Sequence, residues 1–313
     1  MGCAVPAGRR AGRAGRALTA TVLLAGAGGD LGERTAAALV ARGATVRALT
    51  RPTASPTKRA HLTSLGLEVV AADYADAAAL QRACAGVDVV VSTVSGLRPV
   101  VVGAQTQLLD AAVAAGVPRF VPSDYAADYR RLPAGTNRNL ELRREFMHRL
   151  DAAPVQATSV LVGAFADMLT GQAPLVLFSR RRVLYWHDAD QLLDFTTKDD
   201  TAAYTAEVAL DPTTPRFLEI AGSSVSARDL AATMTELSGD RFRPTYAGSI
   251  GFLRTMARIG RAASRDDEAL YPAWQGMQYF DSMFSGDGKL HDLANDRYGV
   301  RPWTSAAEVL AAR

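Results

Sequence analysis

A glycine-rich turn near the start of the chain constrains the fold more than any other feature. The turn is Gly26-Ala27-Gly28-Gly29-Asp30-Leu31-Gly32, and it joins the apolar run TATVLLA at 19–25 to a helical stretch. Gly26 permits a tight turn, while Gly28 and Gly29 let the backbone approach a ligand. Gly32 lets the helix pack closely on the strand. Because the start of a helix offers free N–H groups and a partial positive charge, such a turn is typical of a pyrophosphate-binding site.

The same alternation of strand and helix continues through the first half of the chain. Apolar runs such as VDVVV at 87–91 suit strands buried on both faces, and helical stretches between them supply the crossovers that parallel strands need. Glycines that suit left-handed caps follow the helical stretches: Gly43, Gly66, Gly86 and Gly116. We therefore predict an α/β fold with a Rossmann-type doubly wound parallel sheet over 18–155. A smaller mixed α/β, substrate-binding portion over 156–313 is expected to return partly to that sheet.

The second half of the chain has weaker signals. We predict a strand in QATSVLVG at 156–163 and a hairpin in RRVLYWHDADQLLDFT at 181–196. Helices are expected to begin at Thr197 and Ser226, because each is followed three residues later by an acidic residue. Several aromatic residues either line a pocket for a flat substrate or pack a small core: Trp274, Tyr279, Phe280, Phe284 and Trp303.

Charge and cysteine content narrow the class of protein. The 313 residues carry a formal net charge of +3, and four arginines fall in residues 1–17, which we expect to be a disordered basic leader. Without that leader the charge is close to neutral, so nucleic-acid binding is not expected. The apolar runs are too interrupted for a membrane span, and a cytoplasmic protein is expected. Two distant cysteines and four scattered histidines predict neither a disulfide nor a metal site.

The end of the second strand indicates which dinucleotide is bound. NAD-specific enzymes usually place Asp or Glu there to hold the ribose 2′-hydroxyl, whereas this chain has Leu49-Thr50-Arg51. Arg51 suits the 2′-phosphate of NADP(H), and Lys58 in the next segment adds a second positive charge. The alternative is that Arg51 is an ordinary solvated arginine at a strand end.

These residues resemble the NmrA-like and isoflavone-reductase-like branch of the atypical short-chain dehydrogenases. The resemblance is carried by the glycine spacing, Arg51 with Lys58, Arg119-Phe-Val-Pro-Ser123 and Asp194-Phe-Thr-Thr197, and extends from Thr19 to about Phe242. It implies an NADP(H) site formed by the glycine turn and the ends of strands two to five. By position, the further residues implied are Thr50 at the end of strand two, Asp73 and Tyr74 near the adenine, Ser92, Thr93, Val94 and Ser95 near the ribose and phosphates, and Pro122 and Ser123 near the nicotinamide.

The resemblance breaks at the expected proton donor. Isoflavone-reductase-like enzymes have a lysine shortly before paired arginines on the helix after strand five, and here Asn139 occupies that position, or Glu141 if the register slips. Asparagine does not exchange a proton near neutral pH. Tyr125 is the best remaining hydroxyl donor, unless it only packs beside the cofactor.

Two functions therefore stay open. The first is an NADPH-dependent reductase of a small carbonyl, enone or aromatic substrate. The second is a non-catalytic NADP(H) sensor that passes its state to a protein partner. Loss of the lysine favours the sensor, and the aromatic C-terminal segment favours the enzyme, which we prefer.

Overall fold

A computed structural model describes residues 19–264 and 268–313, so the expected leader lies outside the described residues. Its centre is a six-stranded sheet in which all neighbouring strands are parallel, in the order β3-β2-β1-β4-β5-β6. The strands are β1 (Thr21–Ala25), β2 (Thr45–Thr50), β3 (Glu68–Ala71), β4 (Val89–Ser92), β5 (Arg119–Val121) and β6 (Gln156–Ala157). This order confirms the predicted doubly wound Rossmann-type sheet.

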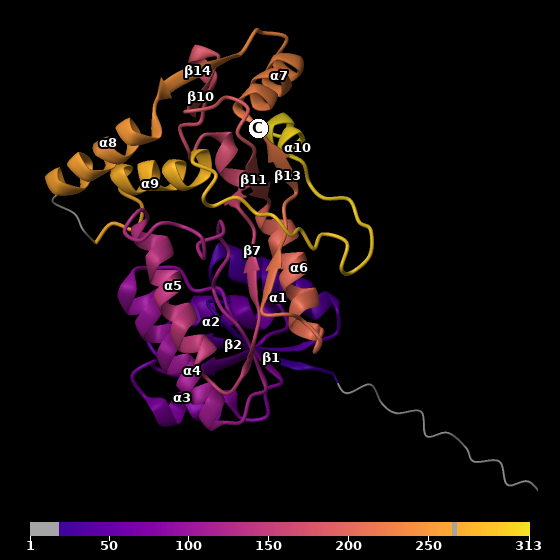
Figure 1. Cartoon of the computed structure of the whole chain (residues 1–313). Helices are drawn as coiled ribbons and strands as arrows, with labels where there is room; N and C mark the ends of the chain where they lie inside the picture. Colours follow the sequence, from indigo (N-terminus) through magenta and orange to yellow (C-terminus); the bar gives the residue numbers. More distant parts are fainter. Residues whose placement is uncertain (1–18, 265–267) are drawn as a thin grey trace, which may run out of the picture.

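Helices cover both faces of the sheet. One face packs against α1 (Asp30–Ala41), α2 (Pro56–Ser64) and α6 (Lys198–Leu210). The other packs against α3 (Ala77–Cys84), α4 (Gln105–Ala114), which continues the π-helical turn η1 (Pro99–Ala104), and α5 (Arg138–Asp151). Because α6 comes from the second half of the chain and lies beside α1 (Figure 1), the C-terminal portion contributes a helix to the layer that covers this face of the sheet.

The predicted helix boundaries agree with the structure. The four glycines predicted to follow helices have φ between 70° and 81°, a region that favours glycine: Gly43, Gly66, Gly86 and Gly116. Thr197 caps α6 by accepting a hydrogen bond from the Asp200 amide. Ser226 and Asp229 form a reciprocal capping box at the start of α7 (Ala227–Ser238).

The hairpin predicted over 181–196 is wrong. Its two strands, β10 (Arg182–Trp186) and β11 (Leu193–Thr196), belong to different sheets. β10 pairs with β9 (Val176–Leu177) and, in parallel, with β14 (Arg243–Gly248), whereas β11 pairs with β8 (Ala164–Phe165) and β13 (Ser223–Val225). His187, in the connection between them, has φ +65°, and both strands pair with segments elsewhere in the chain.

The remaining elements complete the C-terminal portion. β7 (Ser159–Leu161) follows β6 and pairs in parallel with β12 (Phe217–Glu219). The other helices are α8 (Ile250–Ala263), α9 (Ala273–Phe284), α10 (Ala306–Ala311) and the short 3-10 turns η2 (Ala166–Thr170) and η3 (Phe178–Arg180).

Trp186 stacks on Phe280 with ring centroids 5.0 Å apart, and Phe284 is fully buried. These aromatic residues therefore pack a core. None of the described helices is long and apolar enough to cross a membrane.

Candidate functional site

The glycine turn has the geometry of a phosphate-binding loop. Gly26 has φ +85°, and a Cβ there would lie 2.8 Å from Thr93 Oγ1. A Cβ on Gly32 would lie 2.0 Å from the Gly26 carbonyl oxygen, so the turn and α1 pack as closely as backbone allows. A Cβ on Gly29 would meet only the Gly26 oxygen at 3.4 Å. Gly29 is exposed and caps α1 without a side-chain hydrogen bond, so the first amides of the helix are available to an anion.

Two exposed cations lie beside this turn. The Lys58 side chain lies directly against Gly28, because a Cβ built on Gly28 would be 2.1 Å from Lys58 Cε and 2.7 Å from Nζ. Arg51 follows β2, and its positive charge acts on the Tyr74 hydroxyl. Within the described part of the chain, neither cation is hydrogen-bonded or ion-paired. Cations of this kind form charge-assisted hydrogen bonds with phosphates.

The adenine end of the predicted site is also assembled. Thr50 is buried at the end of β2, and Asp73 accepts a hydrogen bond from the Ala75 amide at 2.9 Å. Burial raises the pKa of Tyr74 to about 12, although the charge of Arg51 lowers it. Tyr74 packs against the core cluster beneath α3, within reach of the Arg51 charge.

The ends of β4 and β5 are linked to each other. Thr93 Oγ1 donates to the Ala25 carbonyl at 3.0 Å, while Ser123 Oγ donates to the Val94 carbonyl at 2.7 Å. The Ser123 amide donates to Gln105 Oε1 at 3.0 Å. Ser92 and Pro122 are buried beside this edge, Ser92 Oγ has no partner within the described part of the chain, and Ser95 is exposed. The predicted residues of strands four and five therefore lie along one edge with the glycine turn.

The two candidate proton donors are placed differently. Tyr125 belongs to the core cluster beneath α6, and its hydroxyl is buried. Burial raises the pKa of this hydroxyl far above its ordinary value. Asn139 is buried in α5, where its amide donates to the Leu270 carbonyl at 3.1 Å and its oxygen accepts from Arg138 at 3.0 Å. This placement favours the packing interpretation of Tyr125 and gives Asn139 a role in holding α5 to the segment before α9.

Sequence reasoning did not identify Lys198, which lies at the glycine turn. Lys198 is the first residue of α6, and its Nζ lies 2.6 Å from Asp30 Oδ2. Hydrogen bonds from Lys198 and then Arg34 hold the pKa of Asp30 below its ordinary value. The two residues are 168 positions apart, so no local pattern in the sequence connects them.

Lys289 is a second residue that the sequence did not single out. It forms an ion pair with the buried Asp194 of β11, and Ser224 Oγ lies 3.4 Å from its Nζ. Lys289 lines a narrow cavity of about 10 Å³ with Ala127, Gly163, Ala164 and Met283, among others. Ala127 follows β5 and Gly163 follows β7, so the cavity lies beyond the carboxyl ends of parallel strands.

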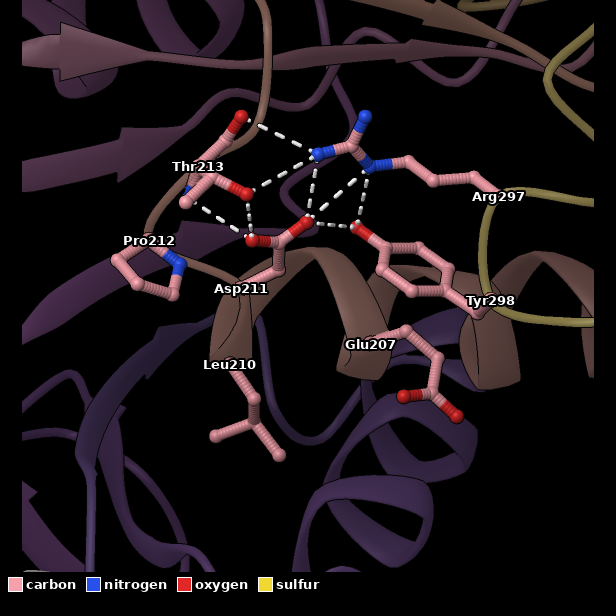
Figure 2. A pocket seen from close by; sticks show the side chains of 7 residues that line it. All are labelled: Glu207, Leu210, Asp211, Pro212, Thr213, Arg297 and Tyr298. Atoms are coloured by element: carbon pink, nitrogen blue, oxygen red, sulfur yellow. Dashed lines mark hydrogen bonds and ion pairs between the residues drawn. The ribbon is translucent and has the colours of Figure 1, made fainter.

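A larger, open depression lies elsewhere. Its lining includes Glu207 and Asp211 at the end of α6, and Arg297 and Tyr298 from the C-terminal segment. Figure 2 shows Arg297 and Tyr298 converging on Asp211, with distances of 2.8 and 3.0 Å. Lys198 at the other end of α6 touches the glycine turn, and 13 helical residues span roughly 20 Å. The depression is therefore remote from the turn and is crossed by internal ion pairs.

Across residues 19–264 and 268–313, no group of three or more His, Cys, Asp or Glu side chains is placed to hold an ion. Cys84 is buried in α3.

Comparison with known proteins places the chain in a family. The family model described as NmrA-like matches residues 18–264. The chain belongs to the NmrA-like family. Among curated relatives of this NmrA-like protein, pinoresinol reductase 1 of Arabidopsis thaliana is 32% identical over an alignment of 208 residues that covers 62% of this chain and 65% of the relative. Pinoresinol reductase 2 of the same plant is 28% identical over 298 residues, covering 90% and 91% of the two chains.

Solved structures share the fold of the NmrA-like protein. The structure of AtPrR2 with NADP+ and (+)pinoresinol matches with a TM-score of 0.78 and 23% identity, covering 94% of this chain and 98% of the other. The predicted resemblance to the NmrA-like and isoflavone-reductase-like proteins is thus confirmed.

Proposed function

We propose that this NmrA-like protein binds NADP(H) and reduces a small aromatic substrate that carries a carbonyl, an enone or a benzylic centre. The observation that carries the proposal is the open glycine turn with Lys58 against Gly28 and Arg51 nearby, both with side chains that have no hydrogen-bond or ion-pair partner among residues 19–264 and 268–313. The curated relatives named as pinoresinol reductases support the reductase class.

In this proposal each part of the edge has a task. The exposed turn and the first amides of α1 bind the pyrophosphate, since Gly29 leaves room there. Arg51 and Lys58 bind the 2′-phosphate, and Tyr74 with Asp73 borders the adenine. The linked ends of β4 and β5, from Ser92 to Ser95 and at Pro122 and Ser123, border the ribose and nicotinamide. Bound NADPH supplies the hydride, and the protein orients it against the substrate.

The test is turnover by the purified protein. NADPH is mixed with a panel of quinones, enones and aryl carbonyls, and the loss of the nicotinamide absorbance is followed. Reduction of at least one compound with NADPH, faster than with NADH, supports the proposal. Binding of NADPH without turnover of any compound would contradict it and favour the sensor, for which the buried and hydrogen-bonded Asn139 in place of a lysine is the supporting observation.

A further inference from the structure

The chain contains few lysines. Of 35 Lys and Arg residues, only Lys58, Lys198 and Lys289 are lysines. Lys58 lies on Gly28, Lys198 binds the first residue of α1, and Lys289 lies against the loops that follow β5 and β7. All three therefore border the carboxyl edge of the parallel strands, where ligands of such sheets bind. The first two lie at the glycine turn, whereas Lys289 lies beside Ala127, after β5, and Gly163, after β7.

The position of Lys289 is fixed by backbone contacts. The Asp128 amide donates to the Gly288 carbonyl at 3.1 Å, and a Cβ on Gly288 would lie 3.2 Å from the Ala127 Cβ. The Leu290 amide donates to Asp194 Oδ2 at 2.8 Å. The chain on both sides of Lys289 is thus held to the loop after β5 and to β11.

Lys289 has one ion-pair partner among the described residues. Asp194 from β11 pairs with it, and Ser224 from β13 touches both. The neighbouring Asp287 lies 3.5 Å from Arg254 of α8 instead. Asp128 on the β5 side is paired with Arg130. Asp194 is therefore the carboxylate that orients Lys289, and it is itself buried.

The cavity beside Lys289 is bounded by side chains that can move. Leu192 is 43% exposed, and Met283 has an unbranched, flexible side chain. A cavity of about 10 Å³ is too small for a ring, so a substrate that reaches the Lys289 ammonium has to displace these two side chains. An arginine at this position would carry the charge but would not give up a proton, whereas a lysine does both.

We propose that Lys289 binds the substrate oxygen and donates the proton that completes the reduction, the task for which Asn139 is unsuited. This role rests on the proposed function. The C–H bond of the dihydronicotinamide breaks and its hydride forms a C–H bond at the substrate carbonyl carbon. The π electron pair moves to oxygen, which takes a proton from Lys289 Nζ. The cofactor is oxidised by two electrons, the carbonyl is reduced to an alcohol, and the neutral amine recovers its proton from water.

Labelling provides a readout that does not depend on activity. With only three lysines, acetylation of each can be followed by mass spectrometry in the full-length protein. We expect a substrate from the turnover panel, added to the protein saturated with NADP+, to slow the acetylation of Lys289 at least severalfold and to leave Lys58 as it is with NADP+ alone. An unchanged rate at Lys289 would overturn the proposal.

Kinetics separate proton donation from charge. Lys289→Met should lower kcat by roughly 10² to 10⁴, and Lys289→Arg should keep KM close to that of the wild type while kcat stays low. Arg228→Met removes an exposed cation from α7 and is the matched control, with unchanged kcat expected. If Lys289→Met keeps the wild-type kcat, the role of Lys289 is refuted, while the proposed function stands. Failure of the wild type to reduce any compound would instead remove the proposed function and this role with it.

Discussion

Arg51 is the residue on which the choice between NADPH and NADH depends in the proposed site. Its guanidinium is exposed and has no partner within the described part of the chain, so it loses no internal contact when it binds a phosphate. Charge-assisted hydrogen bonds contribute about 1.5 to 3 kcal/mol. We expect Arg51→Ala to weaken NADPH binding roughly 10- to 100-fold and NADH binding little, as measured by fluorescence titration. Equal losses for the two cofactors would contradict the assignment.

Gly29 and Gly32 are predicted to respond differently to a larger side chain. A Cβ on Gly29 meets one atom at 3.4 Å, but on Gly32 it would overlap the Gly26 carbonyl at 2.0 Å. Gly29→Val should therefore keep the circular dichroism spectrum and most of the thermal stability while abolishing NADPH binding, since the side chain would fill the position that we propose for the pyrophosphate. Gly32→Val should destabilise the fold itself. A Gly29→Val protein that binds NADPH normally would mean that the turn is only structural.

Tyr125 tests whether a buried hydroxyl takes part in the reaction. The hydroxyl lies in the core cluster beneath α6 rather than at the open edge. A general acid contributes typically 10²- to 10⁴-fold to a rate, so the two roles of Tyr125 are easily distinguished. We expect Tyr125→Phe to change kcat by less than about twofold. A loss of 100-fold with unchanged NADPH affinity would restore Tyr125 as the proton donor.

At the scale of elements, the sequence predicted what depends on local pattern. The strands, their helical crossovers, the cap glycines and the caps at Thr197 and Ser226 follow from neighbouring residues, and the structure has them. The hairpin failed because β10 takes a partner about 60 residues away, at Arg243–Gly248. The positions of Lys198 and Lys289 were missed for the same reason. Their partners Asp30 and Asp194 are 168 and 95 residues away, and spacing carries no signal over such distances.

The end of α6 is joined to the C-terminal segment by Asp211. Burial raises the pKa of this carboxyl, but hydrogen bonds from Thr213, Arg297 and Tyr298 outweigh burial, and the pKa lies well below its ordinary value. The contribution of Asp211 to stability is therefore present above the unfolded-state pKa of about 3.9 and is lost as the pH falls through the folded-state value.

We expect Asp211→Asn to lower the free energy of unfolding at pH 7 by roughly 1 to 2 kcal/mol. Urea unfolding at several pH values should show this difference narrowing below about pH 4. Asp190→Asn is the control, because Asp190 pairs with Arg228 on the surface and is 62% exposed. An Asp211→Asn protein whose deficit stays constant with pH would exclude an ionised Asp211 as the cause.

At the scale of the whole molecule, the two portions share structure across the predicted division at 155/156. The sixth strand of the sheet, β6, begins at Gln156, and α6 packs against α1 on the face of the sheet. Lys198 of the second portion binds Asp30 of the first at the glycine turn. We infer that the described residues unfold as one cooperative unit and that a cofactor at the turn stabilises both portions together.

A thermal scan with and without cofactor tests this inference. A ligand present at 100 times its dissociation constant stabilises the folded state by about 2.7 kcal/mol, which raises the midpoint by roughly 5 °C for a chain of this size. We expect NADPH to shift a single calorimetric transition by this amount, and NADH at the same concentration to shift it much less, because NADH lacks the phosphate that we propose Arg51 and Lys58 bind. Lys198→Ala should reduce the stabilisation that NADPH gives to both portions, since it removes the contact between α6 and the turn. Two separate transitions, of which NADPH moves only one, would instead mean that the C-terminal portion folds and unfolds independently of the cofactor-binding portion.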